Sequence, residues 1–271
     1  MDAEKIVWRD AAALVALGYV DFAGIVYNHF NRQDVETDTD SWGMIPKSRP
    51  EYKTAAGMPL WAMDVYYRFL NCGFRLPVSA GSASGVKAAP FGYNRVCVKL
   101  DGPFSYDRWF RSLKAGRSVA TNGPMLFLTV DGKEPGDVLP LAEKGRRSVR
   151  VHAQVSSRTP MDRLEVILNG KTIRSIEGSG KLEADFTVDV GHSGWFAARA
   201  FEKPDRTVRF AHTSPVYVGA TPARDPEALV RLREWIDAYV EQVKALPADS
   251  LNADQKEQWL SMCRRARDSY R

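Results

Sequence analysis

The chain has 271 residues, of which 44% are hydrophobic and 26% charged, a composition typical of a folded globular protein and incompatible with disorder throughout. No segment approaches the roughly 20 apolar residues of a membrane-spanning helix. The first 20 residues include five charged side chains within residues 2–10 and have no long apolar run, whereas a signal peptide would have one. We therefore expect no membrane association, and a cytoplasmic location by default, because nothing in this sequence directs export.

The formal net charge of +5 suits an anionic ligand, but the positive side chains are spread along the chain. Their densest patch, residues 264–271, falls in a predicted helix and is not interleaved with aromatic residues, which argues against nucleic-acid binding. The cysteines are odd in number and widely spaced, so they predict neither a disulfide framework nor a zinc motif: Cys72, Cys97 and Cys263.

The first third of the chain alternates helical and strand-like patterns, which favours a layered α/β arrangement. Residues 3–17 predict a helix, and residues 19–27 predict a buried strand that runs into Asn28 and His29. A second helix is expected over residues 59–73, because proline suits its first turn and glycine its end.

The stretch over residues 71–95 combines a helix end, a short strand at 76–79 and a bare loop. Residues 79–85 carry no side chain larger than a hydroxymethyl group, so another molecule can approach the backbone closely. Two interpretations stay open: a tight turn against a neighbouring element, or an active-site loop, past or present. Further elements are predicted over residues 93–100 (strand), 105–115 (helix) and 118–121 (strand).

From residue 123 onward the hydrophobic period changes to two. Six stretches follow this pattern: residues 125–130, 149–155, 164–168, 182–190, 195–201 and 208–218. Turn sequences such as Asn169-Gly170 supply the positive-φ positions that hairpins require. We therefore predict an immunoglobulin-like β-sandwich over residues 123–220 and a helical tail over residues 221–271, with Asn252 capping the last helix and the tail packing back on the other domains.

Three separated segments carry further information. They are Tyr67-Arg-Phe-Leu-Asn-Cys-Gly-Phe-Arg-Leu-Pro-Val-Ser-Ala-Gly-Ser-Ala-Ser-Gly-Val86, then Gly92-Tyr-Asn-Arg-Val96, and then the run from Trp109 through Ala115-Gly-Arg-Ser-Val-Ala-Thr-Asn-Gly-Pro124. Their order and spacing resemble the later part of the CehA/McbA-type metallohydrolases of the PHP superfamily. The resemblance implies that residues 1–122 form part of a distorted β/α barrel that holds divalent Zn, Mn or Fe and hydrolyses phosphate or carboxylic esters. The expected fold class is then α/β plus all-β: a partial PHP-like barrel, the sandwich and the tail.

The chain departs from that family pattern twice, and both departures remove metal ligands. Members place a His-x-His pair on the first barrel strand, and this sequence has no such pair. Where active members carry Gly-Ser-Asp-Ala-His, this chain has Gly81-Ser82-Ala83-Ser84-Gly85. The resemblance therefore implies a C-terminal portion or a degenerate member, inactive alone, in which a divalent metal is expected only by analogy.

Histidine supply is too small for a catalytic metal site, which needs about three protein ligands. Three of the four histidines, His152, His192 and His212, fall in the predicted sandwich, which leaves His29 alone at the end of a barrel-type strand. Three roles stay open for His29: a structural histidine bonded to a partner, a substrate contact, or a ligand of an incomplete metal site. The acidic residues 34–40 lack the glycine and glutamate of a calcium loop, which favours a solvated loop over weak Ca²⁺ or Mg²⁺ binding.

The remaining chemistry is that of a binding pocket. Backbone N–H groups of residues 81–85 and several polar side chains can hold an anion or a sugar. Besides His29, the candidate pocket residues are Asn28, Ser82, Ser84, Asn94, Arg95 and Asn122. Structural roles also stay open: an ion pair for Arg95, and turn-forming bonds to the backbone for Asn94 and Asn122.

Two function hypotheses follow. The first is a C-terminal portion or degenerate member of a PHP-type metal-dependent hydrolase that is inactive alone. The alternative is a non-catalytic module that binds an anionic or carbohydrate ligand at the glycine-serine loop. A half barrel exposes strand edges, so the first hypothesis expects a cover for them: a missing upstream half, a second copy of the chain, or its own tail helices.

Overall fold

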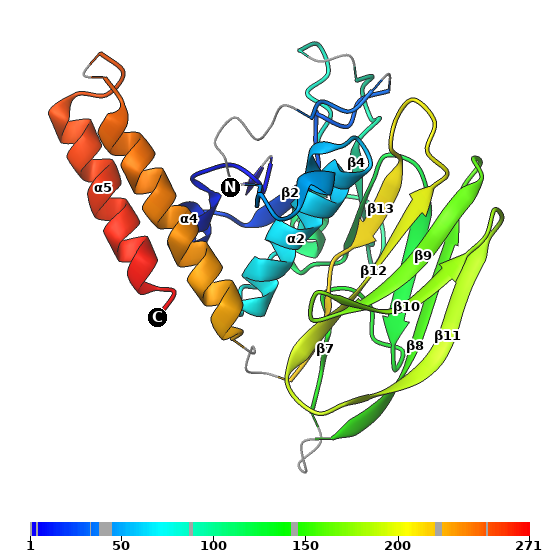
Figure 1. Ribbon diagram of the computed structural model, residues 1–271. Coiled ribbons are helices and arrows are strands. Elements are labelled where there is room, and N and C mark those ends of the chain that lie inside the picture. Colours follow the sequence, from blue (N-terminus) through cyan, green and yellow to red (C-terminus); the bar gives the residue numbers. More distant parts are fainter. Residues whose placement is uncertain are drawn as a thin grey trace.

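The structure is a computed structural model that describes residues 2–3, 5–32, 34–37, 45–86, 89–141, 146–219, 224–247 and 249–271. Figure 1 shows three parts side by side: a C-terminal helical hairpin, a small α/β unit in the middle, and a large β-sandwich. No helix in these ranges combines the length and hydropathy of a membrane span.

A three-stranded parallel sheet forms the centre of the α/β unit. Its strands lie in the order β1 (Asp2–Ala3), β2 (Phe22–Val26) and β3 (Val78–Ala80). The helices that connect them are α1 (Ala11–Ala16), the 3-10 helix η2 (Pro50–Lys53) and α2 (Gly57–Asn71). The predicted buried strand is confirmed as β2. The helix predicted over residues 3–17 is shortened to α1, because residues 6–10 form turns and a bend.

This sheet is not part of a β/α barrel, so the partial PHP-like barrel expected over residues 1–122 is wrong. The next two strands, β4 (Arg95–Val98) and β5 (Ser118–Thr121), form an antiparallel pair, and β5 pairs with the sandwich strand β13 (Phe210–Thr213). A barrel of this kind continues through parallel strands, which an antiparallel hairpin cannot supply. Sheet pairing therefore runs across the boundary predicted at residue 122, and the three-domain division stays a prediction.

The sandwich consists of a large sheet and a three-stranded sheet. The large sheet has the order β10-β9-β12-β13-β5-β4, with β14 on β12 and β7 on β14, and the smaller sheet has the order β11-β8-β6. The remaining strands are β6 (Met125–Val130), β7 (Val138–Leu139), β8 (Arg147–Ser156), β9 (Met161–Leu168), β10 (Lys171–Glu177), β11 (Leu182–Val190), β12 (Gly194–Glu202) and β14 (Val216–Val218).

Alternation along the strands builds the core of the sandwich. In β8, Val149, Val151, Ala153 and Val155 are fully buried between the sheets, while the residues between them are more exposed. The β-sandwich predicted from the two-residue period is therefore confirmed. The stretch predicted as one strand over residues 208–218 divides into β13 and β14, which pair at different places along β12.

Two serine hydroxyls of the sandwich complete the outer edge of β3. Ser214 Oγ accepts a hydrogen bond from the Val78 N–H at 3.0 Å, and Ser118 Oγ donates to the Val78 carbonyl at 3.1 Å. The two hydroxyls lie 2.8 Å apart. Unpaired edge strands invite unwanted pairing with other chains. At Val78 the chain itself covers the edge for which we expected a partner.

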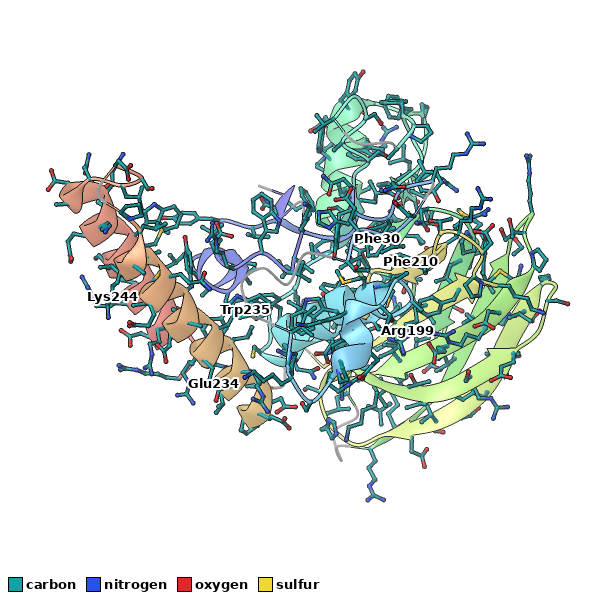
Figure 2. The ribbon with its side chains drawn as sticks, turned by 45° about the horizontal axis from the view of Figure 1, so that its top comes forward. Phe30, Arg199, Phe210, Glu234, Trp235 and Lys244 are labelled. Carbon is teal, nitrogen blue, oxygen red and sulfur yellow. The ribbon has the colours of Figure 1, made fainter. Side chains whose placement is uncertain are left out.

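The C-terminal tail is a hairpin of α4 (Pro226–Ala245) and α5 (Ala253–Asp268) that packs against α1 and α2. Trp235, labelled on α4 in Figure 2, stacks on Trp61 of α2 with ring centroids 5.9 Å apart and planes 4° apart. Its indole N–H donates to the Arg9 carbonyl at 3.1 Å. Tyr270 is fully buried and donates to the Ala12 carbonyl at 2.7 Å. The predicted cap at Asn252 is confirmed by a capping box.

A buried polar network fastens α2 to the large sheet. His212 Nδ1 donates to the Thr213 carbonyl at 2.7 Å, so its Nε2 accepts from the Tyr67 hydroxyl at 2.8 Å. Arg199, which lies where α2 meets the sandwich (Figure 2), donates to Glu165 at 2.7 Å. Burial lowers the pKa of His212 to about 3, so the imidazole is neutral in the folded protein at neutral pH.

We expect Trp235→Ala to lower the free energy of unfolding by about 3–5 kcal/mol, because it leaves a cavity against Trp61 and removes the bond to Arg9. Urea denaturation followed by circular dichroism measures the change. Trp8→Ala is the matched control, since Trp8 is 42% exposed, and it should cost less than about 1 kcal/mol. Equal losses in the two variants would contradict the packing role of Trp235.

His212 should make the protein less stable in acid. An unfolded histidine titrates near 6.5, so between about pH 6.5 and 3 the unfolded chain takes up a proton that folded His212 does not. Stability therefore falls as pH falls through this window. In His212→Gln the slope of unfolding free energy against pH should decrease by up to about 1.4 kcal/mol per pH unit. Exposed His192→Gln is the control, and parallel profiles for all three proteins would contradict the assignment.

Candidate functional site

Polar residues gather where β2 and β3 end and β4 begins. We call residues 27–31, 81–84 and 93–95 the polar corner; these segments follow β2, follow β3 and open β4. Sheets with parallel strands commonly bind ligands beyond the carboxyl ends of those strands. Six of the seven pocket residues predicted from the sequence lie in this corner: Asn28, His29, Ser82, Ser84, Asn94 and Arg95.

Asn94 ties the three segments of the corner together. Its Nδ2 donates to the carbonyls of Tyr27 at 2.9 Å and Gly81 at 3.2 Å. Its backbone N–H donates to Ser82 Oγ at 2.9 Å, and the Ser82 hydroxyl donates back to the Asn94 carbonyl at 3.2 Å. Asn94 is therefore a structural hub that bonds the backbone of other segments, rather than a turn residue that bonds its own.

Four buried oxygen atoms of the corner form no hydrogen bond with the described residues: Asn28 Oδ1, Asn94 Oδ1, Tyr27 Oη and Tyr93 Oη. Because two carbonyls fix Nδ2 of Asn94, its Oδ1 has to point away from them. Burial raises the pKa of Tyr27 above its ordinary value, so this phenol keeps its proton. An unpaired buried polar atom costs about 1–3 kcal/mol, and a partner from outside the chain would remove that cost.

His29 is 8% exposed and is held by charged neighbours. The Lys5 ammonium lies 2.8 Å from Nε2 of His29, and the Glu36 carboxylate lies 3.8 Å from the same nitrogen. An ammonium group only donates, so Nε2 accepts and the neutral ring carries its proton on Nδ1. His29 is thus bonded to a partner within the chain, as in the first of the three roles that the sequence left open.

Three glycines in and near the bare loop have open space on their Cβ side among the described residues. A Cβ atom added at Gly81, Gly85 or Gly92 would meet nothing within 4 Å. Ser84 is exposed, whereas Ser82 is 8% exposed and engaged with Asn94. The space is open only where a side chain would stand: the Gly81 N–H donates to the Val26 carbonyl at 3.0 Å, its carbonyl accepts from Asn94 Nδ2, and the Val86 N–H closes a turn on the Ala83 carbonyl at 3.0 Å.

Arg95 and Asn122 have structural contacts. The Arg95 guanidinium donates to the carbonyls of Tyr93 and Gly123, each at 3.1 Å, so it bonds backbone rather than an acidic side chain. Asn122 lies outside the corner, where its Nδ2 donates to the Val208 carbonyl at 3.0 Å and its Oδ1 accepts from the Phe210 N–H at 2.8 Å. These bonds fix the strand pairing around β5 and β13.

A cavity of about 420 Å³ adjoins the corner at Tyr93. Its lining, which we call the arginine pocket, is Arg32, Tyr93, Asp205, Arg206, Thr207 and Arg209. Arg209 pairs with Asp205 at 3.0 Å, and the pKa of Asp205 is held below its ordinary value first by the Thr207 N–H and then by Arg209. Within the described ranges, no partner is found for the guanidinium groups of Arg32 and Arg206.

The corner and the arginine pocket are joined by backbone as well as by Tyr93. The Thr207 hydroxyl donates to the Asn31 carbonyl at 2.6 Å, and Arg32 follows directly in the chain. Sequence reasoning missed Arg32 and Arg206 because the loop between β12 and β13 lies about 170 residues beyond the end of β2. The signal in the sequence was only a polar turn, Lys203-Pro-Asp-Arg-Thr207.

The described residues of the chain do not fit a divalent metal site. Ala83 and Gly85 offer no ligand, and Nε2 of His29 is engaged by Lys5. Among the residues that the structure describes, no group of three or more His, Cys, Asp or Glu is placed to hold a metal ion. In the acidic run, Asp34 bonds Asn31, whereas residues 38–40 lie outside the described ranges.

No family model matches the chain, and no curated protein does. Among solved structures, the chain is similar in part to the CARDB domain of a protein from Pyrococcus furiosus, determined in solution by NMR. The identity is 17%, the match covers 35% of this chain and 95% of that one, and the TM-score is 0.22. A TM-score this low carries no argument about function.

The resemblance to the CehA/McbA-type metallohydrolases of the PHP superfamily is therefore wrong. No family model supports it, and the antiparallel pair of β4 and β5 joins the sandwich where the barrel would require parallel strands. The short motifs that suggested it describe a helix end, a bare loop and a hairpin, which build a parallel sheet beside a sandwich in this chain.

Ser82→Ala should lower the free energy of unfolding by about 1–3 kcal/mol, because it leaves the buried N–H and carbonyl of Asn94 without their hydroxyl partner. The exposed Ser84→Ala is the matched control and should stay within about 0.5 kcal/mol of the unmodified protein. Urea denaturation of both variants measures the difference. Similar losses in the two would contradict the role of Ser82 in the corner.

Proposed function

We propose that this chain is a non-catalytic binding module that holds a small hydroxylated anion, such as a sugar phosphate or a sugar acid, at the polar corner and the arginine pocket. The observation that carries the proposal is that Tyr93, whose buried hydroxyl has no partner among the described residues, lines the same cavity as Arg32 and Arg206, for whose guanidinium groups the described ranges show no partner either. The two features would serve opposite parts of one ligand.

The unmatched oxygens support hydroxyl groups as part of the ligand. The amide oxygens of Asn28 and Asn94 are acceptors, and they need a donor, which an ionised carboxylate does not have. The hydroxyls of Tyr27 and Tyr93 can donate or accept. A polyol supplies donors and acceptors on neighbouring carbon atoms, and so suits such a mixed set.

The arginine pocket supports an anionic group. Arg32 and Arg206 are exposed, and guanidinium groups bind carboxylates and phosphates with paired, charge-assisted hydrogen bonds. Asp205 is committed to Arg209 and to the Thr207 N–H, so it compensates little of the charge of the other two. The volume of about 420 Å³ lies in the range of small-molecule sites.

The same contacts support binding without catalysis. The Ser82 hydroxyl both donates and accepts in its bonds to Asn94, which holds it as a structural link rather than as a nucleophile. The accepting nitrogen of His29 is engaged by Lys5, so this imidazole is not free to take a proton from Ser82. The corner offers fixed hydrogen-bonding groups, which suits recognition.

Thermal unfolding with glucose 6-phosphate, glucose and inorganic phosphate tests the proposal. At ten times its Kd a ligand stabilises the folded state by about 1.4 kcal/mol, which corresponds to a rise in Tm of about 3–6 °C. We expect the largest rise with glucose 6-phosphate. The double variant Arg32→Ala/Arg206→Ala should weaken its binding about tenfold or more and leave glucose binding unchanged, because only the anionic group loses its partners.

Arg265→Ala is the matched control, since Arg265 is an exposed arginine of the helical tail. Asn28→Leu provides the complementary test, because it should weaken the binding of glucose and of glucose 6-phosphate but leave the binding of inorganic phosphate unchanged. The proposal would be contradicted if none of the three ligands changed Tm. It would also be contradicted if Arg265→Ala weakened the binding of glucose 6-phosphate as much as the double variant does.

A further inference from the structure

A second cavity, of about 440 Å³, lies where the end of α2, the β9–β10 hairpin, β14 and the start of α4 meet. Figure 1 shows the end of α2 close to the start of α4 beside the sandwich, far along α2 from the polar corner. Its size is that of a small-molecule site. None of its lining residues belongs to the polar corner or the arginine pocket.

The wall of this cavity is mainly apolar and is held rigidly. Trp195 is 2% exposed, its indole N–H donates to Asn71 Oδ1 at 2.8 Å, and its backbone N–H donates to Asn169 Oδ1 at 2.8 Å. Asn71 Nδ2 in turn donates to the Asn169 carbonyl at 3.3 Å. The partly exposed apolar residues of the wall are Phe74, Leu168, Ile173 and Tyr217.

Positive charge surrounds the apolar wall. Arg75, Lys171 and Arg224 line the cavity together with one carboxylate, Asp225. Asp225 caps α4, where it accepts from the backbone N–H groups of Glu227 and Ala228 at 2.8 and 3.3 Å, so its charge is directed at the helix terminus. The described surroundings provide no acidic partner for the exposed Lys171, and the Arg75 guanidinium lies 4.9 Å from the ring of Tyr217.

We infer that this cavity is a binding site for a small aromatic carboxylate. The flat apolar body would lie against Leu168, Ile173 and Tyr217, where burial of apolar surface drives binding. The carboxylate would meet Lys171, and the Arg75 guanidinium over Tyr217 would add to the positive charge of that side of the cavity. Neither half suffices: an apolar wall alone does not select an anion, and two exposed cations alone bind acetate weakly.

This inference is independent of the hydroxylated anion proposed for the corner. A polyol would leave the apolar wall of this cavity uncovered, and an aromatic ring would leave the acceptor oxygens of Asn28 and Asn94 unmatched. Variants in one site should therefore leave binding at the other unchanged, because the two linings share no residue.

Isothermal titration with 1-naphthoate tests the site. We expect 1-naphthoate to bind at least about tenfold more tightly than either of two partial analogues. These are 1-naphthalenemethanol, which lacks the charge, and acetate, which lacks the ring. Lys171→Glu should weaken the binding of 1-naphthoate about tenfold or more, because it reverses the charge at the rim of the cavity. Lys181→Glu makes the same change in net charge on the sandwich outside the cavity and should change the affinity less than about twofold.

The Arg32→Ala/Arg206→Ala variant separates the two proposals, since it should keep the affinity for 1-naphthoate. No binding of 1-naphthoate at about 5 mM would overturn the inference, because a preformed cavity of this size should give at least millimolar affinity. The inference would also be overturned if 1-naphthalenemethanol bound as tightly as 1-naphthoate, or if Lys171→Glu and Lys181→Glu changed the affinity for 1-naphthoate equally.

Discussion

Helix α2 has to be covered on nearly all sides, and the rest of the structure follows from this constraint. Eleven of its 15 residues are buried, so it is apolar around almost its whole circumference. Trp61 packs on Trp235 of the tail, and Tyr67 packs on the large sheet through His212. One hydrophobic core therefore joins all three parts, and the large sheet is covered on both faces, by the smaller sheet and by α2.

Local patterns predicted the elements of this fold better than their partners. The two-residue period found the sandwich strands because each strand presents one face to the core, as β8 does with Val149 and Val151. The same two-residue period in β4 and β5 did not predict which sheet these strands join. That choice rests on contacts across about 90 residues, from Ala120 to His212, which no local pattern encodes.

The candidate site divides in the same way. Asn28, Ser82 and Asn94 were found because bare and polar residues at strand ends are a local signal. Tyr27 was not predicted, since an aromatic residue at the end of a buried strand resembles any other core residue. Only the structure shows that its hydroxyl has no partner among the described residues. Arg206 was not predicted either, because only the folded chain brings it into the same cavity as Arg32. Local chemistry shows which residues are suitable, and topology decides which of them meet.

The energetics of the polar corner connect its stability to its proposed role. A buried oxygen without a partner costs about 1–3 kcal/mol, a large fraction of the 5–15 kcal/mol by which a typical domain is stable, and the described part of the chain shows no partner for four such oxygens in the corner. The bonds of Asn94 to Tyr27, Gly81 and Ser82 prevent the corner from relaxing to satisfy these atoms internally. A ligand that supplies donors then gains the full hydrogen-bond energy, because the protein groups are already desolvated and oriented.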